Sequence, residues 1–159
     1  MGRLLMPPSK LMTGRFDIKG LPVGYFAESP ETAAYEVLCR REALALSMSE
    51  LARRNLLCVQ TKVPLSLLDL RPHAQSWPVL QSLRFAITQE LASDAYAQGF
   101  HGIAYRSAQQ YGMDCYALFG DALKTLKTAW SEALLQPGTS NLHGAVAAAL
   151  LGSKVPLTT

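Results

Sequence analysis

The chain has 159 residues, a size typical of one domain and sufficient to bury one sizeable core. Hydrophobic residues make up 49% of the sequence and charged residues 17%, which excludes an intrinsically disordered chain. The formal net charge of +3 is too small to indicate nucleic-acid binding, but it favours an anionic small ligand if the positive charges converge.

The cysteines and the apolar segments indicate the cellular compartment of the protein. The three cysteines form neither an even disulfide set nor a CxxC metal pair, so we expect a reducing compartment. The apolar run 4–6 is stopped by Pro7 and Pro8 and is too short for a signal peptide. No segment approaches the ~20 apolar residues of a membrane span. We therefore predict a cytoplasmic chain that makes no contact with membranes.

The first predicted elements follow a turn-rich start. Residues 14–27 predict a strand or loop, a turn, and then a short strand at 23–27. The run Ser29-Pro30-Glu31 is typical of a helix start, because Ser caps, Pro suits the first position and Glu favours the positive end. We expect this helix to extend from about residue 30 to about residue 45.

The rest of the chain continues with mixed elements. In chain order we predict a short helix from Ser47 or Ser49 to about 54, strands at 55–63 and 66–70, a helix at 79–98, strands at 102–107 and 114–119, helices at 121–135 and 143–151, and a strand at 154–158. Gly99 is placed to end the long helix. Strands and helices neither alternate strictly nor segregate. The predicted class is therefore α+β or a mixed α/β sheet, as one domain over residues 1–159.

Arg15 and Tyr25 are candidates for gripping a nucleotide. An Arg beside Gly14 can hold a pyrophosphate with its planar fork of donors. The alternative is a surface Arg in a turn, which the residue by itself favours. The ring of Tyr25 could stack on a flat heterocycle such as nicotinamide, although a lone strand tyrosine is more often packing.

Glu36 is the unusual residue of the first predicted helix, because apolar side chains flank it. A carboxylate held near an apolar wall could stabilise the oxocarbenium ion that forms when a glycosidic bond breaks. The competing interpretation is an exposed i, i+4 ion pair between Glu36 and Arg40, which the spacing by itself favours.

Ser107 ends a predicted strand, where its hydroxyl could donate to a phosphate or a ribose or could satisfy turn backbone. No base is placed beside it for a Ser-His-Asp hydrolase. The three histidines lack metal-ligand spacing and are interpreted as surface or capping groups, so we expect no metal. No basic patch with interleaved aromatics indicates a nucleic-acid partner.

Two runs, taken together, resemble the signatures of the RES-domain family. The first is GRFDIKGLPVGYFAESPETAAYE at 14–36, and the second is GFHGIAYRS at 99–107, followed by CYALF at 115–119. The resemblance covers about residues 10–120. The Arg, Glu and Ser for which the family is named correspond to Arg15, Glu36 and Ser107.

The resemblance implies a fold similar to ADP-ribosyltransferases, NAD as substrate, and cleavage of the nicotinamide–ribose bond with water or inorganic phosphate as acceptor. It assigns catalysis to the three named residues and NAD binding to a second group: Gly14, Tyr25, Gln89 and Arg106. It further implies a toxin of a toxin–antitoxin pair with an Xre-like antitoxin as partner, and by analogy a homodimer. Transfer of ADP-ribose to a protein, or a non-catalytic partner-binding role, are the alternatives.

The chain departs from the family pattern in two places. Members usually begin with an extra strand that carries a Tyr-Arg pair, whereas here only residues 1–13 precede Gly14, so we expect that strand to be short, altered or missing. The family also often has Arg where this chain has Gln109. Both departures concern the rim of the expected pocket rather than its central residues.

Overall fold

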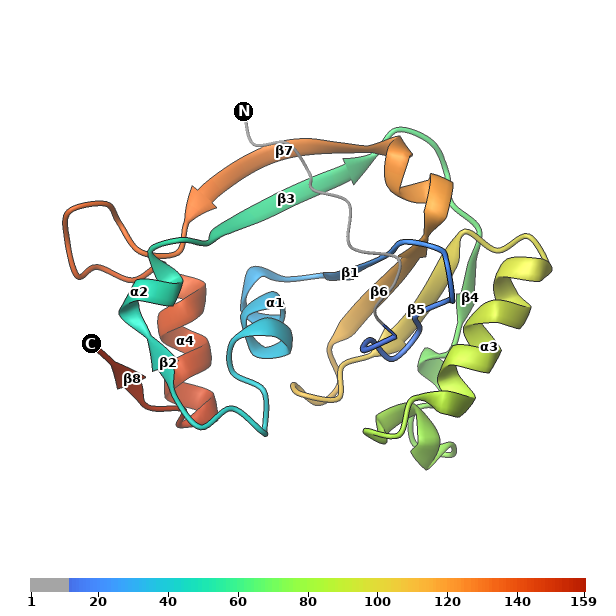
Figure 1. Cartoon of the computed structure of the whole chain (residues 1–159), viewed down its shortest axis with the longest axis horizontal. Helices are drawn as coiled ribbons and strands as arrows, with labels where there is room; N and C mark the ends of the chain where they lie inside the picture. The colour runs from blue at the N-terminus through green and yellow to red at the C-terminus, as the bar shows by residue number, and fades with distance from the viewer. Residues whose placement is uncertain (1–11) are drawn as a thin grey trace.

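A computed structural model describes residues 12–159 of the chain (Figure 1). Within these residues the strands form three separate sheets. The main sheet has the order β1-β6-β5-β4, and the contact between β4 and β5 is its one parallel pairing. Its strands are β1 (Val23–Ala27), β4 (Leu67–Asp69), β5 (Gly102–Arg106) and β6 (Asp114–Phe119). The α+β class is confirmed, whereas the expectation of one mixed sheet is wrong, because two further pairs of strands stand apart.

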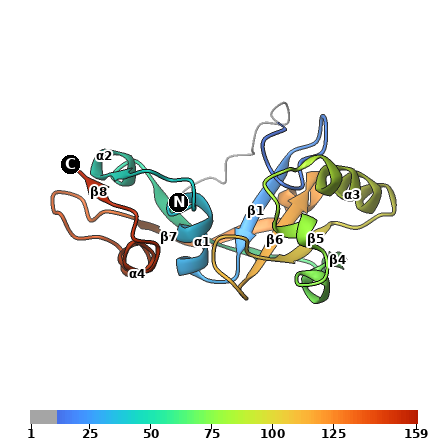
Figure 2. The ribbon, with the colours of Figure 1, turned by 90° about the horizontal axis from the view of Figure 1, so that it is seen from below.

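The two smaller sheets join distant parts of the sequence. The first is an antiparallel ribbon of β3 (Asn55–Thr61) and β7 (Leu126–Ala133). The second is a parallel pair of β2 (Leu46–Ser47) and β8 (Leu157–Thr158). The long ribbon extends from the side of the main sheet to the opposite side of the molecule (Figures 1 and 2).

The helices divide between the two sides that the ribbon connects. One group is α1 (Pro30–Val37), α2 (Met48–Leu51) and α4 (Gly144–Ser153), and on the other side α3 (Ala86–Ala97) lies beside the main sheet (Figure 2). The described part of the chain also contains three short 3-10 helices: η1 (Arg71–His73), η2 (Pro78–Gln81) and η3 (Gly120–Thr125). Among the described residues, no helix combines the length and apolar composition needed to cross a membrane.

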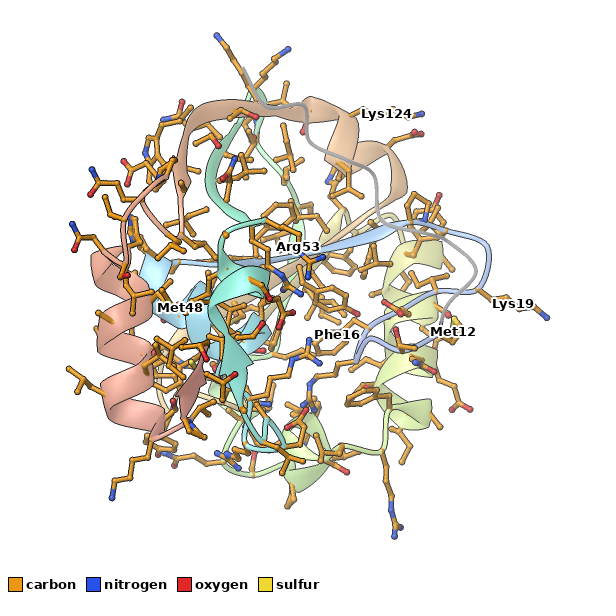
Figure 3. The ribbon with its side chains drawn as sticks, turned by 60° about the vertical axis from the view of Figure 1, so that its left-hand side comes forward. Met12, Phe16, Lys19, Met48, Arg53 and Lys124 are labelled. Carbon is orange, nitrogen blue, oxygen red and sulfur yellow. The ribbon has the colours of Figure 1, made fainter. Side chains whose placement is uncertain are left out.

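Two main clusters of buried side chains hold these groups together. The larger cluster lies between α3 and the main sheet and includes Phe16, Ala92 and Ile103. Figure 3 shows Phe16 in the interior, whereas Lys19 of the same loop projects outward. The second cluster joins α1 to α4 and includes Leu38 and Val146. The loop before β1 and the helix α1 are therefore each anchored by a core of their own.

The helix predicted from residue 30 to residue 45 ends earlier, at Val37. The carbonyl of Ala34 accepts hydrogen bonds from Leu38 N at 2.8 Å and from Cys39 N at 3.0 Å, which closes the last turn. Leu38 and Cys39 then enter the second cluster. The start is as predicted, because Ser29 accepts a hydrogen bond from Thr32 N as the cap.

The helix predicted at 79–98 is also divided. The segment between η2 and α3 is not helical, and the carbonyl of Ser82 in that segment and the carbonyl of Leu80 in η2 accept hydrogen bonds from the side chain of Arg15. The end of the helix is confirmed, because Gly99 follows it with a φ of +88°, in the left-handed region that glycine adopts most readily.

The helix predicted at 121–135 is wrong. Residues 120–125 form η3, and the following residues form β7, whose hydrogen-bond partners are in β3. Pairing with a distant strand overrides the local helical preference of this segment. The predicted final strand is shortened to Leu157–Thr158, and the short helix that Ser47 caps ends at Leu51.

The remaining predicted elements are found close to their expected bounds. The strands predicted at 23–27 and 114–119 have the same bounds as β1 and β6, and the helix predicted at 143–151 corresponds to α4. Two predictions, the apolar run 4–6 and the altered N-terminal strand, fall mostly on residues 1–11 and so lie outside the described residues.

Candidate active site

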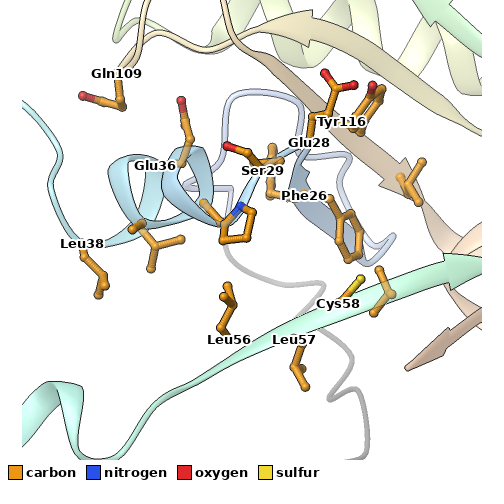
Figure 4. A pocket seen from close by; sticks show the side chains of 18 of the residues that line it. Phe26, Glu28, Ser29, Glu36, Leu38, Leu56, Leu57, Cys58, Gln109 and Tyr116 are labelled. Atoms are coloured by element: carbon orange, nitrogen blue, oxygen red, sulfur yellow. The ribbon is translucent and has the colours of Figure 1, made fainter. Parts of the chain in front are cut away.

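A cleft of about 990 Å³ lies among α1, the main sheet and the β3–β7 ribbon. Its polar and aromatic lining includes residues from the loop before β1, β1, α1, β5 and the loop after β5: Arg15, Tyr25, Glu36, Tyr105 and Gln109. The ribbon contributes apolar side chains, and Figure 4 shows Leu56 of β3 pointing toward α1 and Cys58 pointing toward Phe26. Glu36 and Gln109 lie on the other side of that helix in the same view.

Glu36 and Ser107 contact each other directly, although 71 residues separate them in the sequence. The Ser107 hydroxyl donates to Oε1 of the Glu36 carboxylate. The same hydroxyl oxygen accepts hydrogen bonds from Gln110 N at 2.8 Å and Gln109 N at 3.1 Å. These two backbone donors leave the hydroxyl proton directed at Glu36. Ser107 is buried and held by these hydrogen bonds, so its hydroxyl orients the Glu36 carboxylate.

The alternative interpretation of Glu36, an ion pair with Arg40, is wrong. Arg40 Nε donates to the backbone carbonyl of Glu36 at 2.7 Å, not to its carboxylate. Within the part of the chain that the structure describes, the Glu36 carboxylate forms no ion pair.

Arg15 is buried, which excludes the surface-turn interpretation. Its Nη1 donates to the carbonyls of Leu80 and Ser82, each at 2.7 Å, and its guanidinium lies 5.2 Å from the centre of the Phe85 ring. Burial lowers its pKa from 12.5, while the neighbouring Tyr105 and Glu36 act in the opposite direction. Arg15 therefore remains a cation near the Glu36 carboxylate.

Tyr25 presents its ring to the cleft, and its hydroxyl is engaged behind that ring. The hydroxyl donates to Asp17 Oδ1 at 2.8 Å and accepts from Phe16 N at 2.8 Å. Burial and the bond to Asp17 raise its pKa. A Cβ at Gly14 would lie 2.8 Å from Cε2 of this ring. Glycine at position 14 therefore permits the close packing of the ring against the loop.

Two residues assigned to NAD binding do not line the cleft. Gln89 Nε2 donates to the Gly14 carbonyl at 2.9 Å and so supports the loop from behind. Arg106 Nη1 donates to the Gly112 carbonyl at 2.8 Å and pairs with Asp114. Neighbouring residues of a strand face opposite sides, and in β5 the residue that lines the cleft is Tyr105.

Tyr105 was not among the predicted site residues. It is buried, and its ring centre lies 4.8 Å from that of Phe16. Its place immediately before Arg106 and Ser107, combined with strand alternation, is the signal that could have identified it.

The histidines have structural contacts. His143 caps α4 by accepting from Ala145 N at 3.1 Å, which confirms the capping interpretation, and His101 accepts from Ser66 N. Within residues 12–159, no three His, Cys, Asp or Glu side chains gather in a way that could hold a metal ion.

Cys115 pairs with Tyr105 across β5 and β6, directly behind the site. Burial, first, and then the Glu36 carboxylate raise the pKa of its thiol from 9.0 to about 12. Because the folded state holds this proton more tightly than the unfolded state, its contribution to stability is present below pH 9 and decreases between pH 9 and 12.

Alkylation of the folded protein at pH 8 is therefore expected to modify Cys58 and to leave the buried Cys39 and Cys115 unmodified. Mass spectrometry after iodoacetamide treatment measures this, and the same reaction in denaturant, in which all three thiols react, is the control. Rapid modification of Cys115 in the folded protein would contradict its placement in the core.

Comparison with known proteins gives one match. The family model described as RES domain matches residues 2–137. No curated protein matches, and no solved structure matches. The implied likeness to ADP-ribosyltransferases thus gains no support from structural neighbours. The matched range contains Arg15, Glu36 and Ser107 and ends before α4.

Proposed function

This chain belongs to the RES domain family, and we propose that it is an enzyme that cleaves the nicotinamide–ribose bond of NAD. Membership of the family supports an NAD-related function associated with toxin–antitoxin systems. The observation that carries the finer proposal is the Glu36 carboxylate, which Ser107 orients in a cleft that Arg15 and Tyr25 also line.

The chemistry suits a site that has one oriented carboxylate and no strong acid. When the bond between ribose C1′ and the nicotinamide nitrogen breaks, the electron pair goes to the nitrogen, so the cationic ring leaves as neutral nicotinamide. No protonation of the leaving group is needed. Positive charge develops on the ribose, and the Glu36 carboxylate stabilises it. Water or inorganic phosphate then attacks C1′ and releases a proton.

The other residues bind and position the substrate. Arg15 supplies a buried positive charge for the pyrophosphate or the neighbouring ribose. The ring of Tyr25 stacks against nicotinamide. The contacts of Ser107 support orientation of Glu36, in place of the phosphate or ribose contact that the sequence suggested. Gln109 lines the cleft where the family often has Arg, so the rim of the site carries one positive charge fewer.

Partners follow from the same proposal. As the toxin of a type II pair, the protein would be neutralised by an Xre-like antitoxin, and a homodimer remains a proposal by analogy.

Nicotinamide release from NAD by the purified protein, with and without inorganic phosphate, tests the function. We expect release, and its dependence on phosphate identifies the acceptor. An absence of release by folded protein would contradict the proposal. In that case biotinylated NAD incubated with cell lysate distinguishes protein ADP-ribosylation, which labels a protein band, from a non-catalytic role.

A further inference from the structure

We infer that Asp17 is a positioning residue that holds the Tyr25 ring as a preformed wall of the cleft; this inference rests on the proposed function. Asp17 does not line the cleft itself, whereas Tyr25 and Gly14, which it contacts, both do. Its effect on a ligand would therefore be transmitted through Tyr25.

Both oxygens of the Asp17 carboxylate are engaged. Oδ1 accepts the Tyr25 hydroxyl at 2.8 Å, and Oδ2 accepts Gly14 N at 2.7 Å. Asp17 N also donates to the Gly14 carbonyl at 3.3 Å, which closes the turn that contains Arg15. One carboxylate thus ties the ring on β1 to the turn that carries the buried cation of the site. Hydrogen bonds to a charged acceptor are among the stronger ones in proteins.

The Tyr25 hydroxyl has no proton left for a ligand, because it donates to Asp17 and accepts from Phe16 N. Tyr25 remains 40% exposed, so what it offers is the ring surface. A ring held at its distal end does not have to be ordered when a flat heterocycle binds, which removes an entropic cost of binding.

The turn has supports that do not depend on Asp17. Thr88 Oγ1 of α3 donates to the Arg15 carbonyl at 2.6 Å, and Gln89 of the same helix donates to the Gly14 carbonyl. Phe16, in the same turn, is fully buried in the larger core cluster. We therefore expect the Asp17→Asn variant to fold, with the loss confined to the carboxylate contacts. An asparagine cannot accept both hydrogen bonds, because when its amide oxygen accepts Gly14 N its amide nitrogen faces the Tyr25 hydroxyl, whose proton then loses its acceptor.

The test is steady-state nicotinamide release by Asp17→Asn, Tyr25→Phe and the double variant. Stacking acts on bound substrate and transition state alike, so Asp17→Asn should raise KM for NAD about tenfold and change kcat by less than about twofold. In the Tyr25→Phe background, which lacks the hydroxyl, Asp17→Asn should raise KM no further. The control is Asp94→Asn, the same change at an exposed residue of α3, which should alter neither parameter.

An equal rise in KM in both backgrounds, or a fall in kcat with KM unchanged, would overturn the inference. A second measurement does not depend on activity: the ring signal of Tyr25 in the NMR spectrum of protein labelled with ¹³C-tyrosine. Asp17→Asn should shift this signal and Asp94→Asn should not. If the parent protein releases no nicotinamide, the proposed function fails, and the NMR measurement still decides whether Asp17 positions the ring. An unshifted signal would overturn the positioning role.

Discussion

Glu36→Gln is expected to lower kcat for nicotinamide release by about 10²- to 10³-fold and to leave NAD affinity nearly unchanged. Glutamine has the shape of glutamate, and its amide oxygen can still accept the Ser107 hydroxyl. What it lacks is the negative charge that offsets the positive charge on the ribose in the transition state. The measurement is kcat from nicotinamide release, together with the Kd for NAD from calorimetry.

The matched control is Glu90→Gln in α3, because Glu90 is exposed and its side chain has no hydrogen-bond partner in the described part of the chain. Its kinetics should equal those of the parent protein. Normal turnover by Glu36→Gln would remove Glu36 from catalysis and leave the cleft without the group that carries the proposed reaction.

Arg15→Ala is expected to reduce both stability and NAD binding. Removing the guanidinium leaves the Leu80 and Ser82 carbonyls without their partner and removes the contact with the Phe85 ring. The free energy of unfolding should fall by about 2–4 kcal/mol. The lost cation should weaken NAD binding by at least about tenfold. Urea denaturation measures the first effect, and calorimetry at a temperature where the variant is folded measures the second.

Arg84→Ala provides the comparison for Arg15→Ala. Arg84 lies in the same stretch of chain as Ser82 and Phe85, but its side chain is exposed, so both measured quantities should stay within error of the parent protein. If Arg15→Ala is as stable as the parent protein, the two hydrogen bonds to the carbonyls make no net contribution to the free energy of unfolding. Parent-like NAD affinity would remove Arg15 from the binding site.

The sequence predicted correctly those helix ends that depend on residues close by in the chain. Ser29 and Ser47 cap helices where their side chains can reach the backbone three residues on, and Gly99 ends α3 with a positive φ. Residues 126–133 are different, because their conformation depends on pairing with β3, which lies far away in the sequence. The non-helical segment between η2 and α3 has a similar cause, since its Ser82 carbonyl accepts a hydrogen bond from the distant Arg15.

The residues of the site could also be predicted only in part, because some of their contacts join distant parts of the sequence. Arg15, Glu36 and Ser107 were identified together through the family resemblance, but the hydrogen bond between Glu36 and Ser107 spans 71 residues and has no local signal. Gln89 was predicted to bind NAD, but its side chain contacts the back of the Gly14 loop and does not line the cleft. The alternation of β5 contained enough information to choose Tyr105 over Arg106 for the cleft.

The helix α4 lies beyond the range that the family model matches, but it belongs to the same core cluster as α1. The family match stops at residue 137, yet Val146 and Ala149 of α4 share a core cluster with Ala34 and Leu38, which lie on and directly after the helix that carries Glu36. A chain cut at that boundary would retain every matched residue and lose the apolar surface against which α1 packs. The helix that carries Glu36 is thus supported in part by residues beyond the matched range.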